Sequence, residues 1–224
     1  MIVFDNYIRD YNEAVFEIDK EAAIEVVETA LEQGVTPEQV VFNIIIPSIE
    51  EMMAVIVENA DTNLAQHFMT AQIAAEITEK MLAKFTTPPE VVGKVIIGTS
   101  FGDLHSLGKR IVIGCLKSMM VDVVDLGVNI KAEAFVDAAV AHGAQVIAMS
   151  SMMVHSATGE EGSLRVRALL KERNLEDQIK LVVGGAPYRF DHELYSKTGA
   201  DNWAADGVTA AKMISQLILE VKAS

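Results

Sequence analysis

Apolar residues recur at two different periods along this chain, and the change of period divides the chain into two halves. From about residue 5 to residue 85 they recur every three or four positions, as Ala22, Val26 and Ala30 do, which is typical of amphipathic helices. The last of these helices is predicted over residues 63–85. The pattern as a whole predicts about four helices, which would pack as a four-helix bundle.

Glycine, proline and threonine mark the ends of these predicted helices. Gly34 is placed to end one helix and Thr36-Pro37 to start the next, because threonine caps helix starts and proline suits the first turn. Pro47 is expected to break or kink the helix that follows. Residues 86–90 hold two threonines and two prolines, so no helix is expected to continue through them.

After that break, short apolar runs alternate with stretches of helical period. Five such pairs predict an α/β fold with a doubly wound, five-stranded parallel sheet of Rossmann or flavodoxin-like type. The predicted domains are therefore a helical one over residues 1–87 and an α/β one over residues 88–224. The strands are expected at residues 94–98, 122–125, 146–150, 180–183 and 203–205, and the helices at 108–120, 131–142, 160–173, 190–198 and 207–221.

Composition narrows the class of protein. The chain has 224 residues, half of them hydrophobic, so a substantial core can form without disulfides. Cys115 is the only cysteine, which excludes a disulfide framework and a cysteine-rich metal site and favours the cytoplasm. The net charge of −14 disfavours nucleic acid as a partner. Neither a signal peptide nor a membrane span is predicted.

Polar residues and glycines follow three of the predicted strands. Asp103 and His105 come after the first strand, Ser150 ends the third, and Gly184-Gly185 follows the fourth. If the strand order is 2-1-3-4-5, the first and third strands flank the switch point, where ligands bind in such sheets. A carboxylate two residues before a histidine suggests a metal ligand whose second ring nitrogen is held by that carboxylate.

Other motifs in the same loops are less well matched. Gly108 is expected to let the chain turn closely into the next helix. A phosphate-binding loop needs four residues between its glycines and Ser or Thr after its lysine, but five residues separate Gly102 from Gly108-Lys109, and Arg110 follows. No G-x-G-x-x-G motif follows the first strand, which disfavours a nicotinamide enzyme. Ser150 stands where a receiver domain has an aspartate, and it lies on no G-x-S-x-G turn, which disfavours a hydrolase.

Taken together, these loops resemble those of the cobalamin-binding domain. The helical half resembles the four-helix cap domain of methionine synthase and its relatives. The whole chain is thus similar to the stand-alone corrinoid proteins of anaerobic methyltransferase systems. The residues that carry the resemblance in the second half are Asp103, His105 and Gly108 of the D-x-H-x-x-G stretch, Ser150 after the third strand, and Gly184 and Gly185 after the fourth.

The resemblance implies that the D-x-H stretch binds the cobalt of cobalamin. His105 would replace the cofactor's own dimethylbenzimidazole as the lower cobalt ligand. Asp103 would accept a hydrogen bond from the other ring nitrogen of His105. Ser106 would extend that link to solvent.

The other matching residues are implied to hold the nucleotide tail of the cofactor. Ser150 would meet the displaced tail as it enters the sheet, and Gly184 and Gly185 would let the tail pass close to the backbone. Met152 stands where the serine motif of the family usually has leucine, and this substitution conserves volume.

The resemblance also implies a function, that of a methyl-carrying subunit rather than a complete enzyme. The chain would take a methyl group from a substrate:corrinoid methyltransferase and give it to a corrinoid:acceptor methyltransferase with a tetrahydrofolate-type or thiol acceptor. A reductive activator would be a third partner, and neither nucleic acid nor a membrane would be involved. The alternatives are a cobalamin-dependent sensor module, which would be expected to carry a fused DNA-binding segment, and the subunit of a cobalamin mutase.

Overall fold

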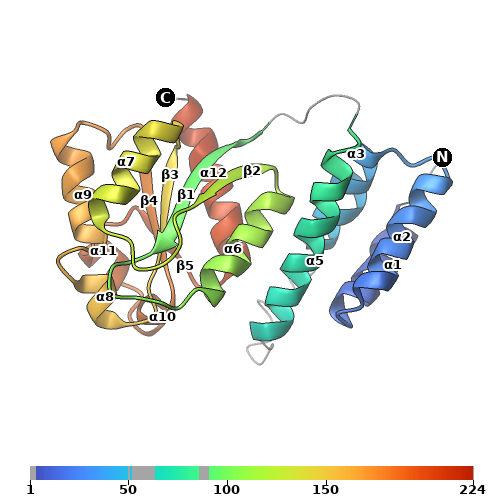
Figure 1. The fold of residues 1–224 in the computed structure, drawn as a ribbon, viewed down its shortest axis with the longest axis horizontal. Coiled ribbons are helices and arrows are strands. Elements are labelled where there is room, and N and C mark those ends of the chain that lie inside the picture. Colours follow the sequence, from blue (N-terminus) through green and yellow to red (C-terminus); the bar gives the residue numbers. More distant parts are fainter. Residues whose placement is uncertain (1–3, 50, 52–63, 86–90, 224) are drawn as a thin grey trace. The chain divides into compact units, whose positions relative to one another are not determined.

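A computed structural model describes residues 4–49, 51, 64–85 and 91–223 of the chain (Figure 1). The chain divides into two compact units, one over Met1–Glu90 with Lys117–Met119 and the other over Val91–Leu116 with Met120–Ser224. The break expected at residues 86–90, and with it the expected boundary between residues 87 and 88, lies outside the described residues.

The first unit is helical, as the apolar period predicts. Gly34 follows a helix with a φ of +89°, a conformation that glycine adopts without strain, and its N–H donates to the carbonyl of Leu31. Thr36 starts the next helix by accepting a hydrogen bond from the N–H of Gln39 at 3.2 Å. The described helices are α1 (Asp5–Phe16), α2 (Lys20–Glu32), α3 (Pro37–Val40), which continues into the π-helical turn η1 (Val41–Ile45), and α5 (Leu64–Leu82).

Pro47 does not end its helix. The chain stays helical over residues 46–49, and the irregularity is the π-helical turn η1, which ends two residues before the proline. Proline removes one N–H donor and crowds the carbonyl four residues earlier, and a widened turn relieves both problems. The break or kink expected at Pro47 therefore takes the form of a π turn.

The second unit is built on a parallel sheet of five strands, as predicted, and the strand order is β2-β1-β3-β4-β5. The central strand β1 is buried at all but one position, as expected of a strand covered on both faces, whereas the edge strand β2 is half exposed. The five strands are β1 (Gly93–Thr99), β2 (Val121–Asp125), β3 (Val146–Ser150), β4 (Lys180–Gly184) and β5 (Asn202–Ala204).

Helices connect these strands, and two of the predicted helices differ from the structure. A short helix that the sequence did not predict, α8, follows β3 directly, because five residues are too few to show a period. The single helix expected at 190–198 is two short helices, interrupted where Asp191 is extended. The helices are α6 (Leu107–Ser118), α7 (Ala132–His142), α8 (Val154–Thr158), α9 (Ser163–Glu172), α10 (Ala186–Phe190), α11 (Leu194–Lys197) and α12 (Gly207–Ala223).

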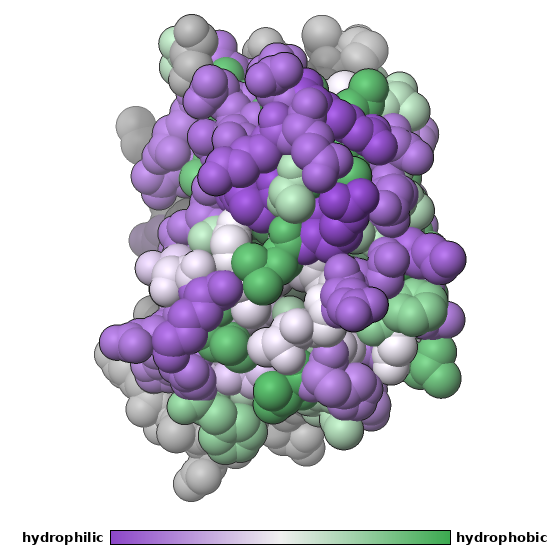
Figure 2. Space-filling view, turned by 90° about the vertical axis from the view of Figure 1, so that its left-hand side faces the viewer, coloured by the Kyte–Doolittle hydropathy of each residue, from purple (hydrophilic) through white to green (hydrophobic). Residues whose placement is uncertain are grey.

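One hydrophobic core cluster of this unit lies between the sheet and helices α7 and α9 (Figure 1). Phe135 of α7 is fully buried there, and its ring lies so close to Gly98 of β1 that a β-carbon at that glycine would meet it at 2.9 Å. Figure 2 shows that the outer surface on this side is hydrophilic over most of its upper half and more mixed below. Among the described residues, no helix is long and apolar enough to cross a membrane.

Replacing Phe135 by alanine should lower the free energy of unfolding of this unit by about 3–5 kcal/mol, because a fully buried ring is lost and a cavity is left. Urea unfolding followed by the fluorescence of Trp203 measures the change, since Trp203 is the only tryptophan and packs against the core. The control is Phe190→Ala, which removes a ring that is 90% exposed and should change stability by less than about 0.5 kcal/mol. Equal effects of the two substitutions would contradict the described core.

Candidate functional site

The carboxyl ends of the central strands bring three predicted site segments to one edge of the sheet. Thr99 at the end of β1 pairs with Ser150 at the end of β3, and Ser150 pairs with Gly184 at the end of β4. The strands β1 and β3 flank the point where the strand order reverses, which is where ligands bind in sheets of this type. The loops that follow these strands therefore form one continuous site.

The segment between β1 and α6, residues 100–106, is called the histidine loop below. Gly102 has a φ of +79°, and the N–H of Asp103 donates to the carbonyl of Ser100, so the chain turns sharply as it leaves the sheet. The Oδ1 atom of Asp103 then accepts a hydrogen bond from the backbone N–H of His105 at 2.9 Å. This local turn, typical of aspartate, places the His105 ring beside the Asp103 carboxylate.

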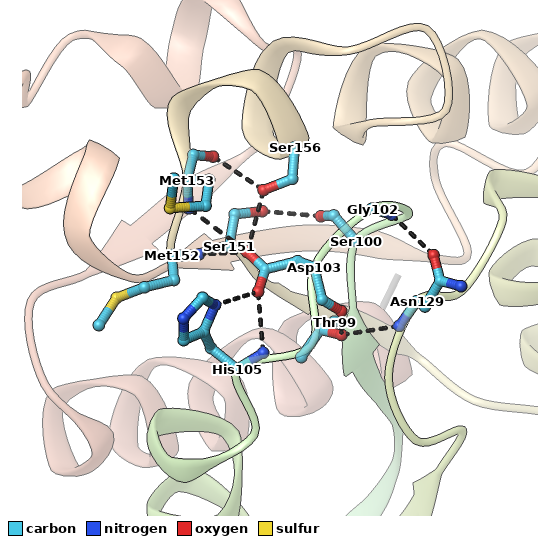
Figure 3. Close-up of polar contacts among 10 residues, drawn as sticks. All are labelled: Thr99, Ser100, Gly102, Asp103, His105, Asn129, Ser151, Met152, Met153 and Ser156. Atoms are coloured by element: carbon cyan, nitrogen blue, oxygen red, sulfur yellow. Dashed lines mark hydrogen bonds and ion pairs between the residues drawn. The ribbon is translucent and has the colours of Figure 1, made fainter.

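The Asp103 carboxylate is the most heavily hydrogen-bonded side chain of the site (Figure 3). Its Oδ1 accepts from the backbone N–H and lies 2.9 Å from the ring Nδ1 of His105. Its Oδ2 accepts from the N–H of Met152 at 2.6 Å, from the N–H of Met153 at 3.3 Å and from the hydroxyl of Ser156 at 2.9 Å. The carboxylate is thus held by both the histidine loop and the segment after β3, and Asp103 is only 1% exposed.

These donors keep Asp103 ionised. Burial alone raises the pKa of a carboxyl group, but the hydrogen bonds from His105, Met152 and Ser156 outweigh it and lower the pKa of Asp103 to about 2. An ionised carboxylate can only accept hydrogen bonds, so the proton of a neutral His105 ring lies on Nδ1. The lone pair of the ring is then on Nε2.

The His105 ring points this free nitrogen outward. Its side chain is 58% exposed, whereas the Asp103 side chain behind it is fully buried. Among the described residues, Nε2 has no hydrogen-bond partner. An imidazole with one nitrogen held by a carboxylate and the other open is the usual arrangement of a histidine that binds a metal.

Ser156 is a site residue that the sequence did not reveal. It lies on α8, and its hydroxyl donates either to Asp103 Oδ2 or to the carbonyl of Met153. Ser106, which the resemblance links to this network, accepts from the N–H of Arg110 through its backbone carbonyl. The sequence does not reveal Ser156, because α8 has only five residues and neither composition nor period indicates so short a helix.

The structure gives a different account of each of the three predicted glycines. Gly108 lies in the first turn of α6 without a positive φ, so the expected need for a tight turn is wrong, and a β-carbon there would meet nothing within 4 Å. Gly185 has a φ of +115°, and its β-carbon would lie 2.0 Å from the carbonyl oxygen of Ser151, so the fold itself requires it. At Gly184 a β-carbon would meet only the carbonyl oxygen of Ala204, at 3.4 Å.

Two other predicted residues lie at the same edge. Ser150 is half-buried at the end of β3, and its carbonyl accepts from the N–H of Ser100. Met152 takes part through its backbone N–H, which donates to Asp103, while its side chain is 46% exposed beside the His105 ring in Figure 3.

Large apolar side chains are exposed on both loops that carry this hydrogen-bonded network. Such side chains near one another on a surface mark a binding site for an apolar ligand or partner. At Gly108, three residues after His105 in the chain, a β-carbon would meet nothing within 4 Å. The exposed residues are Leu104 and Leu107 after β1, and Met152, Met153 and Val154 after β3.

Comparison with known proteins identifies the ligand. Residues 93–212, more than half of the chain, match the B12 binding domain family. The chain belongs to this family. Trimethylamine corrinoid protein 2 of Methanosarcina mazei is 32% identical over 206 residues, which cover 89% of this chain and 91% of that protein. The trimethylamine corrinoid protein of Methanosarcina barkeri is 30% identical over 219 residues, covering 93% of this chain and 96% of that protein.

Solved structures show the same fold as this B12-binding chain. A cobalamin-binding protein from Desulfitobacterium hafniense has a TM-score of 0.75 at 18% identity and covers 92% of this chain and 96% of its own. A chain of the methanol:cobalamin methyltransferase complex from Methanosarcina barkeri has a TM-score of 0.76 at 21% identity, covering 96% and 80%. The predicted fold class and the predicted resemblance to corrinoid proteins are both confirmed.

The cofactor of the B12-binding domain is a cobalamin, as predicted, and the residues of the site fit it. The cobalt of a cobalamin arrives already bound to four ring nitrogens, so the protein has to supply no more than one ligand on one face. The free Nε2 of His105 is suited to that position. The exposed apolar side chains of the two loops and the open space at Gly108 would suit the macrocycle of such a cofactor.

The low pKa of Asp103 makes the stability of the cofactor-free protein depend on pH. A carboxyl group whose pKa is lowered by folding stabilises the protein fully above about pH 4, and this contribution is lost as the pH falls toward 2. Asp103→Asn should therefore lower the free energy of unfolding above about pH 4 and reduce its loss between about pH 4 and pH 2. Urea unfolding at a series of pH values, followed by Trp203 fluorescence, measures both effects.

The matched control for this titration is Asp177→Asn, which removes an exposed carboxylate. That variant should keep the pH dependence of the wild type. If Asp103→Asn also keeps it, the hydrogen bonds described here do not hold the ionised carboxylate.

Proposed function

We propose that this corrinoid protein carries a methyl group on bound cobalamin between two enzymes. The first is a substrate-specific methyltransferase, and the second is a methyltransferase whose acceptor is of the tetrahydrofolate or thiol type. A reductive activator is the third partner. The observation that carries the proposal is the 2.9 Å contact between Asp103 Oδ1 and His105 Nδ1, which leaves Nε2 for cobalt.

The names of the relatives support a methylated amine or alcohol as the methyl source. Several are trimethylamine corrinoid proteins, and others, at 27% identity, are dimethylamine corrinoid proteins of Methanosarcina mazei. The structural relative from Methanosarcina barkeri belongs to a methanol:cobalamin methyltransferase complex. The lone cysteine, Cys115, is buried and forms no disulfide, which suits the reducing cytoplasm in which we place this activity.

In this proposal cobalamin supplies the cobalt that accepts a methyl group and later gives it up. His105 holds cobalt through Nε2, and Asp103 fixes the ring in the tautomer that leaves this nitrogen free. The ionised Asp103 also makes the imidazole a stronger donor to the metal. Ser156 and the N–H of Met152 hold the carboxylate in place, so its orientation does not depend on the exposed His105 ring.

The remaining site residues are assigned to the body and tail of the cofactor. Gly108 leaves room beside His105, and Met152 presents an exposed apolar side chain to the macrocycle. Ser150 and Gly184 lie side by side at the strand ends, where the nucleotide tail would enter. We assign residues 1–87 to a cap domain, because they resemble the helical cap of methionine synthase, and residues 88–224 to the cofactor domain.

The decisive experiment is reconstitution with cobalamin followed by methyl transfer. The wild type should bind cobalamin with the visible spectrum of a histidine-coordinated form, and His105→Ala should lose that spectrum. Asp103→Asn should weaken the coordination by about 10–100-fold, because a carboxylate behind a ligating histidine has an effect of this size. The reduced wild-type protein should then gain a methyl group when a methyltransferase and its methylated amine or methanol are added.

Two further variants serve as controls. His142→Ala changes an exposed histidine at the end of α7 and should behave as the wild type in every step. Gly108→Leu should leave the unfolding free energy nearly unchanged, because space is open there, yet it should block cobalamin uptake. The proposal fails if the wild type takes up no cobalamin, if His105→Ala keeps the wild-type spectrum, or if no donor methylates the reduced protein.

A further inference from the structure

The loop between β2 and α7, residues 126–131, contacts the histidine loop at several points and is called the clamp loop below. Its central residue, Asn129, has a φ of +59°, a conformation that asparagine tolerates better than most residues with a side chain. The backbone N–H of Asn129 lies 3.0 Å from both the carbonyl oxygen of Asp103 and the hydroxyl of Thr99. Its side-chain Oδ1 accepts from the N–H of Gly102 at 2.8 Å. Asn129 therefore binds three residues at the turn that presents Asp103, namely Thr99, Gly102 and Asp103 itself (Figure 3).

Asn129 binds the backbone around Asp103, whereas the donors described for the candidate site bind the carboxylate of Asp103. The carbonyl of Asp103 accepts from Asn129 and, at 2.7 Å, from the hydroxyl of Thr99. Gly102 has a φ of +79° and precedes Asp103 directly, so without the Asn129 side chain this flexible residue loses its hydrogen-bond acceptor. Rotation at Gly102 would move the carboxylate away from the His105 ring.

A second contact joins the end of β2, directly before the clamp loop, to the start of α6, directly after the histidine loop. Asp125, the last residue of β2, forms an ion pair with Lys109 of α6 and also accepts from the N–H of Gly127 at 2.8 Å. Lys109 lies four residues after His105, and its side chain is only 3% exposed, so the ion pair with Asp125 joins a buried ammonium group to the end of β2. The segment after β2 thus holds the histidine loop both before and after His105.

We propose that Asn129 is a positioning residue for the cobalt ligand His105. It fixes the turn at Gly102 and the backbone of Asp103, so that the Asp103 carboxylate meets His105 Nδ1 and directs Nε2 toward the metal. This inference rests on the proposed role of His105 as the ligand. It extends that role to a residue of another loop that touches neither the metal nor the histidine ring.

The test compares Asn129→Ala with Asn174→Ala in the full chain. Asn174 also has a positive φ, +55°, and lies outside the candidate site, so both substitutions impose the same backbone strain. In the protein reconstituted with cobalamin, Asn129→Ala should lower the ratio of histidine-coordinated to uncoordinated cofactor by about threefold to tenfold, the effect of one lost hydrogen bond. Asn174→Ala should leave that ratio within about twofold of the wild type.

A readout that needs no cofactor is the nitrogen NMR spectrum of the His105 ring in the free protein. Asn129→Ala should shift the Nδ1 signal toward that of a ring without a carboxylate partner, and Asn174→Ala should not. Asn129→Asp should restore the wild-type ratio and spectrum, because a carboxylate oxygen can accept from Gly102 and aspartate also tolerates a positive φ. Asn129→Gly keeps the backbone conformation without the side chain, and it should show the same loss as Asn129→Ala.

The possible failures are distinguishable. If wild-type cobalamin shows no histidine coordination, the proposed function fails and this inference fails with it. If the wild type is coordinated but Asn129→Ala and Asn129→Gly keep its ratio, only the role of Asn129 is contradicted. Equal losses in Asn129→Ala and Asn174→Ala would also contradict it, because backbone strain alone would then explain the change.

Discussion

The site depends on one buried charge, the carboxylate of Asp103. A buried carboxylate is costly unless hydrogen bonds replace the water it loses, and here donors from two loops do so. Because those donors lower its pKa to about 2, Asp103 stays an acceptor near neutral pH. The His105 ring therefore has to donate from Nδ1, and its reactive nitrogen faces outward. The buried Asp103 carboxylate therefore determines which nitrogen of the exposed His105 ring is free to bind a metal.

The fold supplies these donors from segments that are distant in sequence. The reversal of strand order places the ends of β1 and β3 side by side, so the loop after β1 meets the N–H groups of Met152 and Met153. Helix α8 turns the chain so that Ser156 reaches the same carboxylate. The loop after the edge strand β2 holds the turn from the opposite side through Asn129. The Asp103 carboxylate and its backbone are thus fixed by three loops of one rigid sheet.

Much of this arrangement could be predicted from the sequence. The alternation of apolar runs with helical stretches is strong enough to predict the parallel sheet and to place Asp103 and His105 after its first strand. The strand order that puts this strand at the switch point was an assumption, and the structure supplies it. Ser156 could not be predicted, because it lies on a five-residue helix and serine is common in loops. Asn129 was also missed, since a positive φ leaves no periodic signal. The close turn expected at Gly108 was wrong, because only the structure distinguishes a glycine that leaves space from one such as Gly185 that the backbone requires.

The central claim is that the Nε2 atom of His105 binds the cobalt of the cofactor. Electron paramagnetic resonance of the protein loaded with cobalamin in the cobalt(II) state tests it most directly, because a nitrogen ligand on the lower face splits the cobalt lines. In protein labelled with nitrogen-15 at histidine, and loaded with unlabelled cobalamin, the splitting should change to that of the heavier isotope. In His105→Ala the isotope effect should be absent. A nitrogen splitting that does not change when histidine is labelled would show that the ligand is the base of the cofactor, and it would contradict the account.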